Sequence, residues 1–184
     1  MTFPSSRGQV ASVARDSAHR FSKTPVERIE LVAGEGVAGD AHRGETVQHL
    51  SRIRADPSQP NLRQVHLIHG ELFDDLGSRG FSVGPGDLGE NIVTRGIALL
   101  ALPRGTLLKI GSAELEVTGL RNPCKQIEAF EAGLLKAVLD RGLNGELIRK
   151  AGIMGIVRQG GSVAVGDEIT VALPEGEHIP LEPV

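Results

Sequence analysis

The chain has 184 residues, of which 40% are hydrophobic and 23% are charged, a balance typical of a globular protein with a hydrophobic core. This length favours one domain. Twenty Lys and Arg against twenty-three Asp and Glu give a net charge of −3, and the chain contains neither Trp nor Tyr. This composition argues against a strongly basic nucleic-acid binder and against a platform that stacks unpaired bases.

Neither a membrane span nor a signal peptide is expected. No apolar run approaches the roughly 20 residues that cross a bilayer, and the first residues lack the apolar stretch of a signal peptide. We therefore expect a cytoplasmic protein. Cys124 is the single cysteine, which excludes an internal disulfide and a multi-cysteine zinc site.

Short strands joined by glycine turns dominate the expected structure. Alternating apolar residues predict strands at 9–13, 28–32, 64–68, 90–95, 106–110, 113–118, 153–158 and 169–173. Helical spacing predicts a short helix over 69–76 and a helical region over 123–141, interrupted at Gly133. The polar stretch that follows the first strand and ends at Lys23-Thr24-Pro25 is expected to be a loop, as are residues 50–62. The fold class is therefore mostly β with small helices (α+β), arranged as a twisted or closed β-barrel.

The surroundings of Cys124 indicate a chemical role. Asn122 and Pro123 favour a helix start with Asn122 as the N-cap, which would place Cys124 in the first turn. Arg121 and Lys125 flank the cysteine, and both features favour a thiolate. Two roles are open. A Cys–His hydrolase would need a histidine base near the sulfur of Cys124. A soft metal in a cofactor that brings its own sulfur ligands would need only the Cys124 thiolate from the protein.

Two other motifs are weak. Gly34-x-Gly36-x-x-Gly39 matches the dinucleotide-binding pattern, but no helix is predicted after it. His66-x-x-His69 crosses a predicted strand–helix junction and lacks a strong third zinc ligand. Neither is expected to bind its usual ligand.

Three segments together resemble the MOSC domain, which is named for the C-terminal domain of molybdenum cofactor sulfurase, and specifically its small stand-alone bacterial members. They are Gly39-Asp40-Ala41-His42-Arg43-Gly44, Gly89-Glu90-Asn91-Ile92-Val93-Thr94-Arg95-Gly96 and Arg121-Asn122-Pro123-Cys124. The resemblance covers about residues 8–174. The predicted organisation is one MOSC domain over 1–184, with a loose proline-rich tail at 175–184. The chain departs from many stand-alone members after Gly44, where 45–48 lack their second glycine and lysine.

The resemblance implies a β-barrel-like fold that binds the molybdenum cofactor, a pterin dithiolene carrying molybdenum and a phosphate. It implies that Cys124 ligates the metal or carries persulfide sulfur. Asp40 and His42 are expected to orient the site or transfer protons. Cations and polar groups near the three segments are expected to bind the cofactor. These cofactor-binding candidates are Asn91, Thr94, Arg95, Arg121, Asn122, Lys125, Arg43 and Arg158.

Three functions remain open at this point. The leading one is a molybdenum-dependent oxidoreductase that reduces N-hydroxylated compounds with electrons from a partner reductase. The second is a carrier that passes sulfur or the cofactor to an acceptor, with a cysteine desulfurase as partner. The third is a barrel without cofactor in which Cys124 is structural. An oligomer is compatible with the sequence. The 184 residues leave no room for an aminotransferase-like domain, so we do not expect desulfuration of free cysteine.

Overall fold

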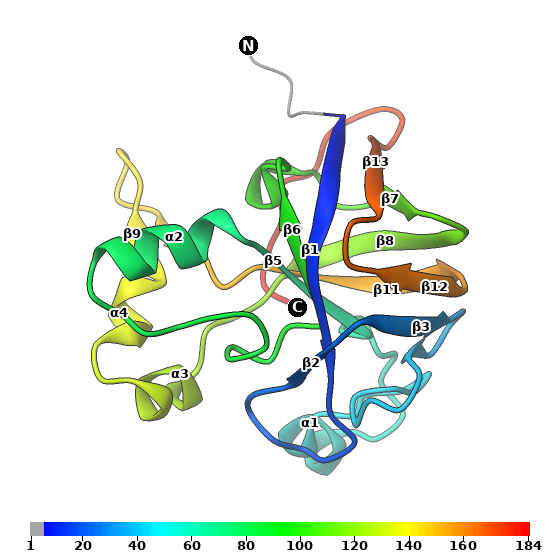
Figure 1. The fold of residues 1–184 in the computed structure, drawn as a ribbon, viewed down its shortest axis with the longest axis horizontal. Helices are drawn as coiled ribbons and strands as arrows, with labels where there is room; N and C mark the ends of the chain where they lie inside the picture. The colour runs from blue at the N-terminus through cyan, green and yellow to red at the C-terminus, as the bar shows by residue number, and fades with distance from the viewer. Residues whose placement is uncertain (1–5) are drawn as a thin grey trace.

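The computed structural model describes residues 6–184. Short strands predominate in it, as the sequence predicts (Figure 1). The elements are β1 (Arg7–Arg15), β2 (Thr24–Val26), β3 (Arg28–Val32), β4 (Gly36–Val37), α1 (Leu50–Ala55), β5 (Val65–His69), α2 (Glu71–Ser78), β6 (Ile92–Arg95), a 3₁₀ turn (Leu99–Ala101), β7 (Leu107–Ile110), β8 (Ala113–Leu120), α3 (Lys125–Phe130), α4 (Leu134–Ala137), β9 (Leu139–Arg141), β10 (Leu147–Arg149), β11 (Ile153–Gln159), β12 (Gly161–Ala164) and β13 (Glu168–Ala172). No helix in this part of the chain is long and apolar enough to cross a membrane.

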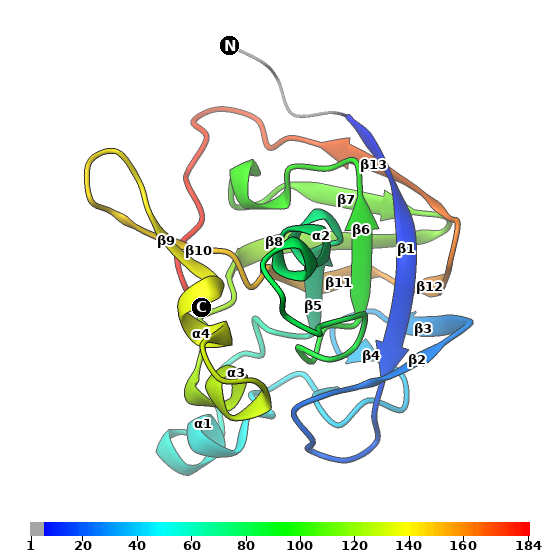
Figure 2. The same cartoon turned by 60° about the vertical axis from the view of Figure 1, so that its left-hand side comes forward.

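Within the described residues, seven strands close into a barrel. The order β13-β7-β8-β11-β5-β6-β1 returns to its start because β1 also pairs with β13 (Figure 2). The β5–β6 pair is parallel and its neighbours in the ring are antiparallel. Closure removes the exposed edges that an open sheet would leave. The expected closed β-barrel is confirmed.

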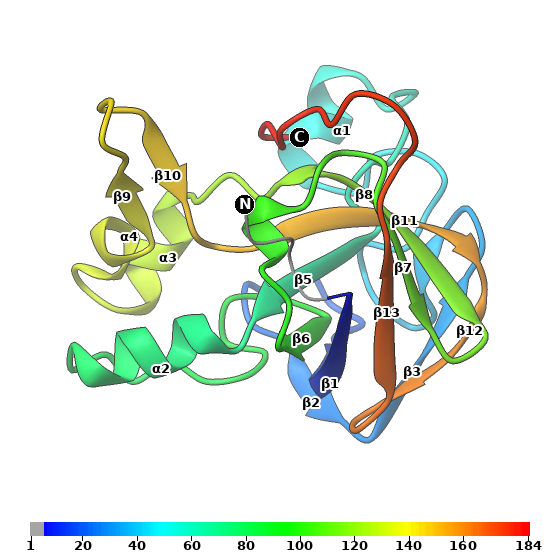
Figure 3. The ribbon, with the colours of Figure 1, turned by 90° about the horizontal axis from the view of Figure 1, so that it is seen from above.

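Two hydrophobic cores hold the molecule together. One fills the barrel, with Leu67, Ile92, Leu115 and Ile153 among its buried members. The second lies beside the barrel, where α2, α3 and α4 pack together around residues such as Ile127 (Figure 3). The helical side unit therefore holds the segment after Cys124 against the barrel.

The predicted hairpin between β7 and β8 is confirmed. Its turn is Gly111-Ser112, and Gly111 adopts a φ of +59°, which glycine reaches without steric cost. Other local predictions were incomplete. Residues 24–26 and 161–164 form strands, 50–55 form α1, and the end of the expected helical region forms the β9–β10 hairpin.

The predicted start of the helix after Cys124 was wrong. α3 begins at Lys125, and Cys124 itself is the N-cap residue, with extended backbone angles of −129° and 170°. Asn122 instead accepts a hydrogen bond at its Oδ1 from Arg149 Nε, at 3.1 Å. This contact with β10 holds Asn122 outside the helix.

The C-terminal tail, which the sequence predicts to be loose, makes backbone hydrogen bonds to the barrel. Leu120 N donates to Glu182 O, Val184 N donates to Leu120 O, and Arg104 N donates to Ile179 O. The tail therefore lies beside the end of β8, close to the segment that leads into Cys124.

Candidate functional site

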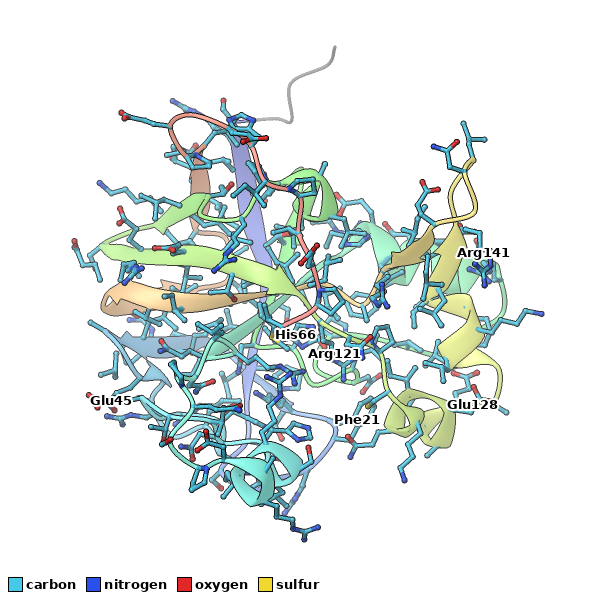
Figure 4. The ribbon with its side chains drawn as sticks, turned by 180° about the vertical axis from the view of Figure 1, so that it is seen from behind. Phe21, Glu45, His66, Arg121, Glu128 and Arg141 are labelled. Carbon is cyan, nitrogen blue, oxygen red and sulfur yellow. The ribbon has the colours of Figure 1, made fainter. Side chains whose placement is uncertain are left out.

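The three motif segments meet at one cavity of about 290 Å³, beside the end of the barrel where β8 leads into α3. From the motifs, His42, Asn91, Arg121, Asn122 and Cys124 line it. In Figure 4, Arg121 and His66 lie close together at the end of the barrel strands, and Phe21 lies beside α3. Segments separated by up to about 80 residues thus build one concave site, which is the usual form of a ligand site.

Positive charge dominates this cavity. Its described lining includes Arg20, Lys23, Arg52, Arg63 and Arg121, and none of the described lining residues carries a carboxylate. The whole chain has a charge of −3, so this concentration of cations is local. A pocket of this kind attracts and retains an anion.

Two of these arginines are held without an acidic partner. Within residues 6–184, neither Arg63 nor Arg121 has a side-chain hydrogen bond or ion pair, and Arg121 Nη1 is buried and unpaired. The Arg121 guanidinium carbon lies 5.8 Å from the centroid of the Phe21 ring, and the Glu90 carboxylate is near enough to attract its charge. Burial, together with the nearby charges of Arg52 and Arg121, lowers the pKa of Arg63 to about 10. Buried guanidinium groups without acceptors indicate a missing anionic ligand.

Behind the cavity wall, Asp40 is the centre of a buried polar network. Its Oδ2 accepts from Lys23 Nζ at 2.9 Å and from Asn91 Nδ2 at 3.1 Å, and its Oδ1 accepts from the His42 backbone N–H at 2.9 Å. Although burial opposes ionisation, hydrogen bonds from His42 and the charge of Lys23 hold the pKa of Asp40 well below its usual range. Asp40 is therefore a fixed carboxylate.

This carboxylate fixes the orientation of His42. His42 Nδ1 lies 3.3 Å from Asp40 Oδ1, and the His42 side chain is 27% exposed on the cavity. A carboxylate at Nδ1 selects the tautomer with its proton on Nδ1, which leaves Nε2 as the free nitrogen. The pair can therefore hold and deliver a proton.

Asn91 has a structural task in addition to lining the cavity. Its Nδ2 donates to Ala14 O and Asp40 Oδ2, and its Oδ1 accepts from the His66 backbone N–H. Both N–H donors and one of the two acceptor positions of the amide are used within the protein. Asn91 therefore joins β1, β5 and Asp40, and its contact with a pterin stays a prediction.

His66 also lines the cavity, as a buried neutral imidazole. Burial, followed by the charge of Arg121, lowers the pKa of His66 well below its usual value. Its Nε2 donates to Ala151 O at 2.7 Å. This hydrogen bond fixes the ring, so His66 is a rigid part of the wall.

Cys124 lies at the edge of the cavity, half-buried. Its Sγ is 3.6 Å from Gln126 Oε1. No cluster of three or more His, Cys, Asp or Glu side chains within residues 6–184 is arranged to hold a metal ion. A metal here would therefore have to arrive with most of its own ligands.

Five predicted cofactor-binding residues do not line the cavity. Arg95 pairs with Asp74 of α2, Arg158 with Glu116 of β8, and Arg43 with Glu35, so their charges are used on the exposed surface. Thr94 is fully buried in β6, and Lys125 is exposed at the start of α3. For the three arginines the physical cause is the same, because acidic partners that are remote in the sequence hold them outside the cavity.

Several lining residues were missed from the sequence, notably Lys23, Arg52 and Arg63. Lys23 and Arg63 lie in polar segments without a motif, and Arg52 lies in a stretch expected to be a loop. A cation in such a segment has the same sequence pattern whether it faces solvent or a cavity. No sequence signal distinguishes these positions.

Comparison with known proteins identifies the family. The family model described as the MOSC domain matches residues 46–170. The chain belongs to the MOSC domain family. This family is associated with binding of the molybdenum cofactor. No curated protein matches the chain.

Solved structures share the MOSC fold seen here. The YuaD protein from Bacillus subtilis has 23% identity and a TM-score of 0.73, covering 95% of this chain and 100% of its own. YiiM from Geobacillus stearothermophilus has 18% identity and a TM-score of 0.67, covering 94% and 79%. YiiM from Escherichia coli has 18% identity and a TM-score of 0.59, covering 93% and 73%.

Proposed function

We propose that this MOSC protein binds the molybdenum cofactor in the cationic cavity and reduces N-hydroxylated compounds with electrons from a partner protein. The observation that carries the proposal is the meeting of Cys124 with two unpaired arginines, the buried Arg121 and the half-buried Arg63, in a cavity whose described lining holds no carboxylate. We further propose that residues 1–184 form one MOSC domain. The cytoplasmic location stays a prediction.

The residues present fit this cofactor. Its phosphate is an anion, and the buried guanidinium group of Arg121 and the half-buried one of Arg63 have no acidic hydrogen-bond partner. Arg52, also on the cavity, would add a third charge. Arginine binds phosphate through two parallel N–H groups, which suits this arrangement. Cys124 would be the single protein ligand to the metal, because a dithiolene supplies sulfur ligands of its own.

When bound, the cofactor would supply a centre that passes an electron pair to the substrate. Reduction of an N–OH group consumes two electrons and two protons, breaks the N–O bond, forms an N–H bond and releases water. His42, protonated on both ring nitrogens and stabilised in that form by the Asp40 carboxylate, would donate its Nε2 proton to the departing hydroxyl oxygen and would be left as the neutral imidazole with its proton on Nδ1. Lys23 and Asn91 would hold Asp40 in place for this task.

The electrons have to come from outside this chain. One cysteine cannot hold an iron–sulfur cluster, and the sequence contains no flavin-binding motif. A reductase partner is therefore part of the proposal.

The first test is molybdenum content. Wild type, Cys124→Ala and Arg158→Gln would be purified anaerobically from a molybdate-fed host that loads other molybdoenzymes. We expect near-stoichiometric molybdenum in wild type and in Arg158→Gln, and loss of most of it in Cys124→Ala. Turnover of N-hydroxylated compounds with a chemical reductant would follow. Absence of molybdenum from all three proteins would contradict cofactor retention.

A second candidate function is sulfur or cofactor carriage, which the exposure of Cys124 favours. The thiol is only half-buried and has a single weak contact, so a partner's persulfide could reach it. Exposure to a cysteine desulfurase and cysteine, followed by intact-protein mass spectrometry, would show addition of one sulfur atom. Transfer to an acceptor without molybdenum binding would favour this function over reduction.

A further inference from the structure

A second groove adjoins the cationic cavity. It has a volume of about 560 Å³ and lies between the segment after β1 and helix α3. The two hollows share Arg20, Phe21, Lys23 and Gln126. The two hollows therefore adjoin at these shared residues.

The groove differs from the cavity in its chemistry. Phe21 and Phe130 both line it and pack against each other, with ring centroids 6.1 Å apart and ring planes tilted by 52°. Ala129 adds a small apolar surface to the same lining. Phe130 is 37% exposed and is not part of either hydrophobic core. The groove is also lined by Asp16, Ser22 and Thr24, so an aromatic surface and a polar one meet in it.

The groove opens next to the sulfur of Cys124. Gln126 lines both hollows, and its Oε1 lies 3.6 Å from Cys124 Sγ. A small molecule that reacts beside Cys124 therefore has its remaining atoms directed either to the arginines or to the aromatic groove. The arginine side suits the anionic cofactor, which leaves the groove for the body of the substrate.

We propose that Phe21, Ala129 and Phe130 bind an aromatic ring of the substrate, so that the protein prefers aryl over small alkyl N-hydroxylated compounds. This inference rests on the proposed function. The open ring of Phe130 offers a face or an edge to a second ring, an arrangement that aromatic pairs favour beyond simple burial. The volume of the groove lies within the range of small-molecule sites.

The kinetic test compares benzamidoxime with acetamidoxime as substrates of the molybdenum-loaded protein. Phe130→Ala should lower the ratio of the two kcat/KM values about tenfold, because it removes the stacking partner. Phe130→Tyr should keep the ratio. Leu143→Ala, at a fully exposed position on the β9–β10 hairpin, is the matched control. A ratio that Phe130→Ala leaves unchanged would overturn the inference.

A binding test needs neither metal nor turnover. Ligand-observed saturation-transfer NMR would compare benzamide with acetamide on the metal-free protein. We expect saturation transfer to benzamide alone, and its loss in Phe130→Ala with an unchanged melting temperature. If no N-hydroxylated compound is turned over, the reductase proposal fails. This experiment then decides by itself whether the groove binds an aromatic ring. No transfer to benzamide in wild type would overturn the groove assignment.

Discussion

The unpaired arginines predict that the protein is more stable without one of them. The pKa of Arg63 falls from 12.5 to about 10, chiefly through burial and then through Arg52 and Arg121. This shift corresponds to about 3 kcal/mol against the charged side chain. Partial solvent exposure and the lost contacts of the aliphatic stem reduce the gain, so we expect Arg63→Gln to stabilise the metal-free protein by about 1 kcal/mol.

The same substitution should weaken anion binding. A hydrogen bond to a charged group is worth about 1.5–3 kcal/mol, so the affinity for inorganic phosphate should fall at least tenfold. Thermal denaturation at low ionic strength, with and without phosphate, measures both effects. We expect the melting temperature of metal-free Arg63→Gln to rise by about 2–4 °C and its stabilisation by phosphate to shrink.

Arg43→Gln is the control, because Arg43 is paired with Glu35 at 2.5 Å on the surface. It should change the response to phosphate little. The reasoning would be refuted if Arg63→Gln lowered the melting temperature of the metal-free protein and left its phosphate response intact. Added salt should reduce the difference between wild type and Arg63→Gln, since screening weakens repulsion among the arginines.

Three further predictions concern the frame of the site. Lys23→Met leaves Asp40 as an uncompensated buried charge, so it should lower the free energy of unfolding, measured by urea denaturation, by about 3–5 kcal/mol. Arg79→Met removes an exposed pair with Asp75 and should lower it by less than about 1 kcal/mol. Equal losses in the two variants would contradict the burial argument. Burial raises the pKa of Glu90 from 4.5 to about 7. The protonated Glu90 side chain therefore contributes its full share of the stability below pH 4.5, and this contribution is lost as the pH rises through 7. Glu90→Gln should therefore flatten a decline of about 3 kcal/mol between pH 4.5 and pH 8, and a parallel pH profile in wild type and variant would exclude this role. Gly86→Ala places a Cβ 2.2 Å from Lys23 O at a φ of +86°, so it should destabilise the protein. The loss should exceed that of Gly34→Ala, whose Cβ at a φ of +75° meets nothing within 4 Å. Similar melting temperatures of the two variants would argue against a close approach of Gly86 to Lys23 O.

Much of the barrel could be predicted because its strands alternate apolar and polar residues, as in Arg28–Val32 and Leu107–Ile110. The β9–β10 hairpin could not, since its strands have three residues each and leave Leu147 and Ile148 exposed. The sequence predicted a closed barrel but did not indicate that β1 and β13 are the strands that close it. Strand partners are chosen by tertiary packing, which local patterns do not contain.

The site was predictable where a motif marks it. Cys124, Arg121 and His42 lie in motif segments, and the structure brings them to one cavity. That Arg158 and Arg95 lie outside the cavity could not be predicted, because their charge partners, Glu116 and Asp74, lie 42 and 21 residues away in the sequence. Pairing of surface charges depends on the fold, so composition near a motif is a poor guide to which cation reaches a ligand.

The strand pair that closes the barrel sets the order of chain synthesis, folding and cofactor loading. Arg7 of β1 lies opposite Thr170 of β13, so the seam joins two ends of the described chain. Nearly all of these residues have to be synthesised before the ring can be sealed, and such a distant pairing forms slowly. Under the proposed function, loading of the cofactor is then a step that follows translation, and a carrier that recognises the finished barrel could distinguish it from a nascent chain.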